Sequence, residues 1–138
     1  RRRELHNIRF YPLQAQYLVR DVYSAASVCL VPLKRGIIGN SVPSKVALIM
    51  ACNRPVINSV DEDSQYFRMF EENRIGLSAP NTDPRAVADA ILRLYMDRAH
   101  RDRLARNGLE FGEAFYSRSL NTANLIHLFA EIVDQRPR

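Results

Sequence analysis

Short apolar runs alternate with amphipathic stretches along the first eighty or so residues of the chain. The apolar runs are rich in β-branched side chains and bounded by turn residues, and they predict strands at Ile8–Tyr11, Val28–Leu33, Pro55–Val60 and Ile75–Ala79. Between them, apolar positions recur at helical spacing in Gln16–Ala26, Ser44–Asn53 and Asp61–Asn73. Strands that alternate with helices predict a parallel sheet with helices on both faces, and continuous apolar strands are typical of such a buried sheet.

The rest of the chain, from Thr82 onward, is predicted to be helical. Thr82-Asp83-Pro84 combines a capping side chain with a proline that suits the first turn of a helix. A second helical pattern covers residues 97–115 with an interruption at Asn107-Gly108, and Ser117 caps a last amphipathic helix. No linker or repeat divides the sequence. We therefore expect one α/β domain over residues 1–138, with a Rossmann-like sheet of about four strands.

The composition is typical of a globular protein and argues against a membrane-spanning or nucleic-acid-binding one. Hydrophobic residues make up 46% and charged residues 25% of the chain, as in globular proteins, and no apolar run reaches the roughly 18 residues of a membrane span. The formal charge of +5 favours anionic partners, but the interleaved aromatics and clustered lysines of nucleic-acid-binding proteins are missing. Cys29 and Cys52 lie in apolar stretches, which indicates buried thiols and a cytoplasmic location.

The segment after the second predicted strand contains the candidate chemistry. Gly36 and Gly39 let the backbone turn, and Pro43 fits the first turn of the following helix. A helix start presents free N–H groups, and open α/β sheets bind ligands at the carboxyl ends of their strands. Three cations lie nearby, Lys34, Arg35 and Lys45. These features favour a phosphate or diphosphate site, with an ordinary capped turn as the alternative, since neither a Walker A nor a dinucleotide-binding glycine spacing is present.

The same segment also resembles a known family. Residues 42–57 read VPSKVALIMACNRPVI. This stretch looks like the C-terminal domain of GT-B glycosyltransferases of the group 1 (family 4) class, in the branch with a proline–serine–lysine turn. In that domain the turn opens a helix that ends in methionine–alanine, and arginine–proline–valine–isoleucine begins the next strand. The flanking segments agree in order and spacing over nearly the whole chain, at residues 7–12, 22–32, 73–77 and 83–84.

The resemblance implies a nucleotide-sugar site. The diphosphate would lie on Gly39, Ser41, Val42, Pro43, Ser44 and Lys45. The donor sugar would contact Asn40, and the base would border Tyr11, Pro12 and Leu13. Apart from the resemblance, Ser64 is a candidate for donor-sugar contact, because its loop also leaves the carboxyl end of a predicted strand. Many family members carry two glutamates where this chain has Asn40 and Leu48, and the second usually holds the ribose hydroxyls. Because leucine accepts no hydrogen bond, we expect ribose recognition to differ here.

The resemblance further implies a retaining transferase that moves a sugar to a polysaccharide, glycolipid or lipid-linked acceptor. Neither a metal nor another cofactor is expected, since backbone amides and basic groups take the place of a cation at the diphosphate. Family members have additional strands before this region and a separate acceptor domain. We therefore interpret the chain as part of a longer enzyme that is inactive alone, and expect its apolar first strand, left at a sheet edge, to favour a homodimer.

Several alternatives stay open. A GT-B-like UDP-sugar epimerase or a phosphorylase would use the same site for different chemistry, and a non-catalytic nucleotide-binding or regulatory module would lack transfer altogether. The acidic run at residues 61–64 either begins a helix or lines the cleft. The basic surface at residues 98–106 is either solvated or contacts anionic lipid at the inner face of the membrane. The histidines are too widely spaced to predict zinc: His6, His100 and His127.

Overall fold

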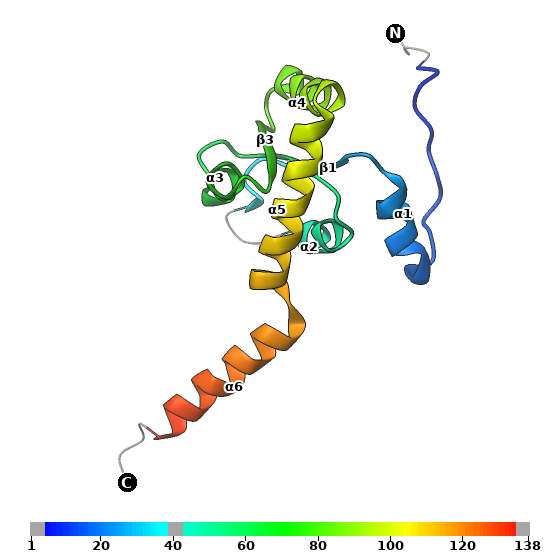
Figure 1. The fold of residues 1–138 in the computed structure, drawn as a ribbon. Coiled ribbons are helices and arrows are strands. Elements are labelled where there is room, and N and C mark those ends of the chain that lie inside the picture. Colours follow the sequence, from blue (N-terminus) through cyan, green and yellow to red (C-terminus); the bar gives the residue numbers. More distant parts are fainter. Residues whose placement is uncertain (1–4, 39–42, 135–138) are drawn as a thin grey trace.

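A three-stranded parallel sheet forms the centre of the protein in the computed structural model, which describes residues 5–38 and 43–134 (Figure 1). The sheet order is β1 (Cys29–Pro32), β2 (Val56–Val60) and β3 (Gly76–Pro80). Helical segments precede, connect and follow these strands: the 3-10 turn η1 (Gln16–Leu18), α1 (Val19–Ala25), α2 (Ser44–Ala51), α3 (Gln65–Asn73), α4 (Pro84–Met96), α5 (Arg98–Tyr116) and α6 (Arg118–Asp134). Because β2 pairs in parallel with both neighbours, the carboxyl ends of all three strands lie at one edge. The α/β, Rossmann-like class predicted from the sequence is confirmed.

Helices cover both faces of this sheet. On one face α2 and α3 pack through Ile49, Met50 and Phe70 against Val56 of the central strand. On the other face α4 and the first half of α5 pack through Leu94 and Leu104 against Ile57 and Leu77. All five residues of β2 are buried, as expected for a central strand whose side chains point alternately to the two faces.

The segment predicted as the first strand, Ile8–Tyr11, forms no strand. Its residues are exposed, and the extended backbone runs past α1, away from the sheet (Figure 1). A strand is held by hydrogen bonds to a neighbouring strand, and no segment within residues 5–38 and 43–134 pairs with this one. The sheet therefore has three strands instead of four, and β1 and β3 are its two edge strands.

The predicted interruption at Asn107-Gly108 is also wrong, because α5 runs unbroken from Arg98 to Tyr116. Gly108 is buried, and a Cβ atom there would lie 3.3 Å from the carbonyl oxygen of Ile75 and 3.4 Å from Cγ of Met50. The missing side chain thus lets α5 pack closely against α2 and the start of β3. The amide Nδ2 of Asn107 donates a hydrogen bond to the carbonyl of Arg74 at 3.0 Å, which adds to the same contact.

The helix start predicted at Asp83-Pro84 is observed. Asp83 is the N-cap of α4 and its Oδ1 accepts a hydrogen bond from the amide of Arg85 at 2.8 Å, with Pro84 in the first turn. The last helix, α6, extends away from the sheet, and its side chains are exposed throughout (Figure 1). Within the described parts of the chain, no helix is both long and apolar enough to cross a bilayer.

Candidate functional site

Asp61 holds together the loops that follow the three strands. It comes directly after β2, and its Oδ2 accepts a hydrogen bond from the amide of Gly36, in the loop after β1, at 2.7 Å. Its Oδ1 accepts one from Nδ2 of Asn81, which directly follows β3, at 3.0 Å. Gly36 has a φ of +77°, which glycine adopts without strain. We call Gly36, Asp61 and Asn81 the strand-end network; it fixes the start of the loop that leads to α2.

The sequence pattern does not reveal this role of Asp61, because the run at residues 61–64 indicates only a helix start or a cleft lining. Helix α3 begins later, at Gln65, and Ser64 is its N-cap. The Ser64 hydroxyl donates to the carbonyl of Asp61 at 2.6 Å and accepts from the amide of Phe67 at 3.1 Å. A hydroxyl oxygen has a second lone pair, so contact of Ser64 with a donor sugar stays a prediction.

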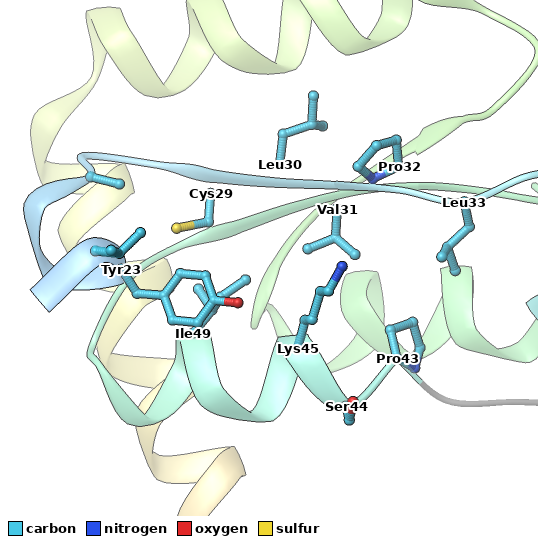
Figure 2. Close-up of a pocket in the computed structure, with 12 residues that line it drawn as sticks. Tyr23, Cys29, Leu30, Val31, Pro32, Leu33, Pro43, Ser44, Lys45 and Ile49 are labelled. Carbon is cyan, nitrogen blue, oxygen red and sulfur yellow. The ribbon is translucent and has the colours of Figure 1, made fainter. Parts of the chain in front are cut away.

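A cavity of about 540 Å³ opens between α1, β1 and α2 (Figure 2). We call it the α2 cavity. Its walls are largely apolar, with Tyr23 from α1, Val31 from β1 and Ile49 from α2. Its polar side is the start of α2, where the Lys45 side chain extends toward β1 and that of Ser44 points away from the strand (Figure 2). The arrangement brings a positive charge to the carboxyl end of β1, beside an apolar space.

The start of α2 has the features of an anion-binding helix end. Pro43 is the N-cap, with φ −65° and ψ 110°, and its side chain makes no capping hydrogen bond. Among the described residues no other side chain accepts a hydrogen bond from the first amides of this helix. Those amides carry partial positive charge, and the ammonium of Lys45 adds a formal one. The other residues predicted to bind the donor here, Gly39, Asn40, Ser41 and Val42, lie outside the described residues.

Cys29 lines the α2 cavity from β1. Burial raises the pKa of its thiol, the neighbouring Cys52 raises it further, and Arg54 partly opposes the shift. The thiol therefore stays protonated, and unreactive as a nucleophile, at neutral pH. Both cysteines are free.

The residues predicted to border the base lie outside this arrangement. Tyr11, Pro12 and Leu13 are exposed, Leu13 completely, and they line neither the α2 cavity nor the strand-end network. Leu48, at the position of the ribose-binding glutamate in the resemblance, is half-exposed on α2. The structure thus brings together Pro43, Ser44 and Lys45 with the strand ends, whereas the base contacts stay a prediction.

Comparisons with known proteins agree on one class. The family model described as "Glycosyl transferases group 1" matches residues 1–97, which are 97 of the 138 residues. The probable glycosyltransferase WbjE of Pseudomonas aeruginosa is 35% identical over 68 residues, covering 49% of this chain and 17% of that protein. Sucrose-phosphate synthase from Thermosynechococcus elongatus superimposes with a TM-score of 0.69 at 31% identity, covering 87% of this chain and 28% of that chain. The chain thus spans less than a third of the length of either relative.

Proposed function

The chain belongs to the group 1 glycosyltransferases, and on this premise we propose that its strand-end loops and the start of α2 bind the diphosphate of a nucleotide-sugar donor. The observation that carries the proposal is the position of Pro43, Ser44 and Lys45 at the carboxyl edge of the sheet, beside the α2 cavity. The longer enzyme would transfer the sugar, with retention, to a polysaccharide, glycolipid or lipid-linked acceptor. We expect it to act in the cytoplasm, at the inner face of the membrane.

Positive charge at the start of α2 favours diphosphate binding. Transfer breaks the bond between the anomeric carbon and a diphosphate oxygen, so negative charge develops on the leaving diphosphate. The helix amides, which are oriented before the reaction begins, and the ammonium of Lys45 favour that charge without a metal ion. Lys45 and the α2 amides are therefore the groups that we assign to the diphosphate.

We prefer transfer to epimerisation as the chemistry of the whole enzyme. A UDP-sugar epimerase needs acidic and histidine side chains in the cleft. The side chains that line the α2 cavity, within the residues that the structure describes, include no carboxylate and no imidazole. A regulatory module that transfers no sugar would share the binding site. A measurement of acceptor-dependent sugar transfer by the longer enzyme therefore distinguishes a transferase from such a module.

Replacing Lys45 with alanine is expected to weaken the binding of UDP or GDP about tenfold. The change removes one charge-assisted contact to phosphate, a class of interaction that contributes about 1.5 kcal/mol. An NMR titration followed at backbone amides measures this, since it detects millimolar affinities. The matched control is Arg118→Ala, which removes the same charge from exposed α6. The proposal is overturned if neither nucleotide shifts the amides at the start of α2, or if both variants lose affinity equally.

We also propose that two copies of the chain pair through the open edge of β1. Leu30 of this strand is 44% exposed, and an apolar strand edge is a template for pairing with another strand. The mass measured by light scattering is expected to rise with concentration from 15.9 kDa toward twice that value. A lysine at Leu30 should keep the chain monomeric, whereas a lysine at exposed Leu92 on α4 should not. A strict monomer at the highest concentration would contradict the dimer.

A further inference from the structure

A second cavity, of about 480 Å³, lies at the opposite edge of the sheet, beside the amino-terminal ends of β1 and β2. One wall is α5, which contributes residues 98, 101, 102, 105 and 106. This spacing of three, four, seven and eight residues places them on one helical face. The other wall consists of two loops, residues 24–27 before β1 and residues 53–55 before β2. The cavity is thus built by three segments that are far apart in the sequence.

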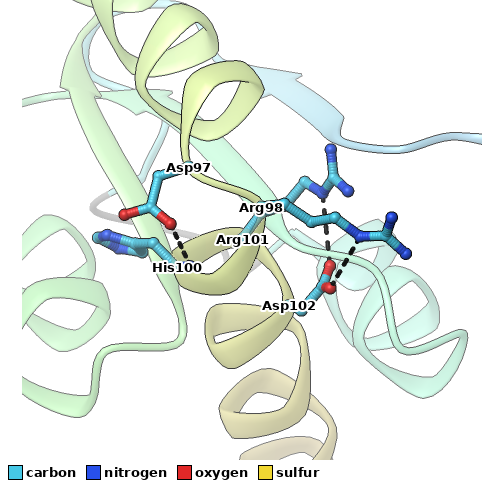
Figure 3. Close-up of polar contacts among 5 residues, drawn as sticks. All are labelled: Asp97, Arg98, His100, Arg101 and Asp102. Carbon is cyan, nitrogen blue, oxygen red and sulfur yellow. Dashed lines mark hydrogen bonds and ion pairs between the residues drawn. The ribbon is translucent and has the colours of Figure 1, made fainter.

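Arginines dominate this cavity. We call it the arginine cavity, after Arg54, Arg98, Arg101 and Arg106. The one carboxylate in its lining is Asp102. Its Oδ2 lies 3.5 Å from Nε of Arg98 and its Oδ1 lies 3.5 Å from Nε of Arg101 (Figure 3). Contacts of this length between partly exposed groups contribute little. Four guanidinium groups against one carboxylate leave a formal charge of +3 in the lining.

Arg54 is held in place without the use of a carboxylate. Its Nε and Nη2 donate to the carbonyl oxygen of Ser24 at 3.1 and 2.7 Å. A guanidinium has five N–H donors, so three of those of Arg54 are not engaged by these bonds. No ion pair among the described residues includes Arg54 or Arg106. The Arg54 side chain is therefore oriented in advance, and its charge is available to an anion.

Arg101 gives a second reason to expect an anion. Its side chain is only 21% exposed, and its nearest carboxylate, at 3.5 Å, is beyond a good hydrogen-bond distance. A charged side chain that is partly buried is stabilised when an anion and hydrogen bonds pair with its guanidinium. Ala105 lies on the same face of α5 as Arg101 and Arg106, and its small, buried side chain does not fill the cavity.

The positive field extends around this end of α5. His100 lies on the other side of the helix, away from the guanidinium groups of Arg98 and Arg101 (Figure 3). Its pKa is lowered, first by burial and then by Arg93 and Arg103, although Asp97 opposes the shift. The arginine cavity is therefore one part of a broader basic surface.

We propose that the arginine cavity binds a phosphate group, as a monoester or diester, at a site separate from the donor loop. Guanidinium groups from a loop and from one helix face would approach the phosphate from two sides, and their planar forks match its oxygens. The donor residues Pro43–Lys45 lie at the carboxyl ends of the strands, whereas this cavity lies at their amino ends. The inference therefore does not depend on the proposed donor site. The phosphate has two sources to be distinguished, a soluble phosphate ester and the headgroup of an anionic phospholipid.

Two arms of one experiment test the proposal with the whole 138-residue chain. In the soluble arm, inorganic phosphate and glycerol 3-phosphate are titrated while NMR follows the backbone amides. In the lipid arm, the chain is sedimented with vesicles of phosphatidylcholine, with and without phosphatidylglycerol, at physiological ionic strength. At least one arm is expected to show binding, which Arg101→Gln weakens about tenfold. The matched control Arg118→Gln carries the same charge change on α6 and should bind like the original chain.

The location and the source then follow from the outcome. Amide shifts at residues 24–27, 53 and 54 with soluble ligand support a free phosphate ester, and binding to phosphatidylglycerol vesicles alone supports a headgroup. Circular dichroism shows whether Arg101→Gln alters the fold. If it does, Arg106→Gln, a second variant at an exposed position, should show the same loss of binding. The proposal is overturned if neither arm shows binding, if the shifts fall at Ser44 and Lys45 instead, or if Arg118→Gln weakens binding as much.

Discussion

Replacing Gly76 with alanine is expected to lower the free energy of unfolding by about 3 kcal/mol, the upper end of the usual cost of overpacking. Gly76 begins β3 and is buried opposite Val56 of the central strand. A Cβ atom there would collide with the carbonyl oxygen of Val56 and would lie 2.8 Å from Cε1 of Phe70. Neither neighbour can move easily, because Val56 is paired on both sides and Phe70 is fully buried.

Urea denaturation measures this effect, and Gly112 provides the matched control. A Cβ atom at Gly112 in α5 would meet only Cβ of Met50, at 3.4 Å, which is ordinary contact. Gly112→Ala is expected to keep or raise stability, since alanine favours a helix over glycine by about 1 kcal/mol. The melting temperature of Gly76→Ala should fall by roughly 10 °C. Equal stabilities of the two variants would show that the start of β3 tolerates a side chain.

Replacing Asp61 with alanine is expected to reduce both stability and donor binding. The change removes the acceptor for the amides of Gly36 and Asn81, which join the loops after β1 and β3 to the end of β2. Hydrogen bonds to a charged group contribute about 1.5 kcal/mol or more each, so the free energy of unfolding should fall by about 2–3 kcal/mol. The loop that leads to α2 would lose its fixed start. We therefore expect the affinity for UDP or GDP to fall at least tenfold.

Two further variants distinguish the effect of the strand-end network from the effect of losing a negative charge. Asp63→Ala removes a carboxylate from the same acidic run, at an exposed side chain that makes none of the hydrogen bonds or ion pairs described for the chain. Its stability and affinity should match those of the original chain. Asp61→Asn keeps one acceptor oxygen, so an intermediate loss is expected. If Asp61→Ala lowers stability but leaves the NMR-measured affinity unchanged, the strand-end network does not position the donor loop.

Part of the candidate site was predictable from the sequence. The turn at Pro43–Lys45 was predicted to lie at the carboxyl end of a parallel strand, and the structure has it beside the end of β1. This succeeds because a strand, a turn and a helix start are encoded by neighbouring residues. The acceptor role of Asp61 was missed, because its partners are 25 and 20 residues away. An acidic residue directly after a buried apolar strand was the available signal.

The sequence by itself determined the α/β class, the positions of β1, β2 and β3 and the start of α4. Each of these depends on local patterns of apolar, turn and capping residues. The tertiary structure alone decided that Ile8–Tyr11 is not a strand, that Gly108 serves close packing and that four arginines share one cavity. Each depends on contacts between residues far apart in the chain, and the hydrophobic periodicity of the sequence does not report such contacts. A strand requires a neighbouring strand, a buried glycine requires a closely packed helix, and a cavity requires walls from several segments.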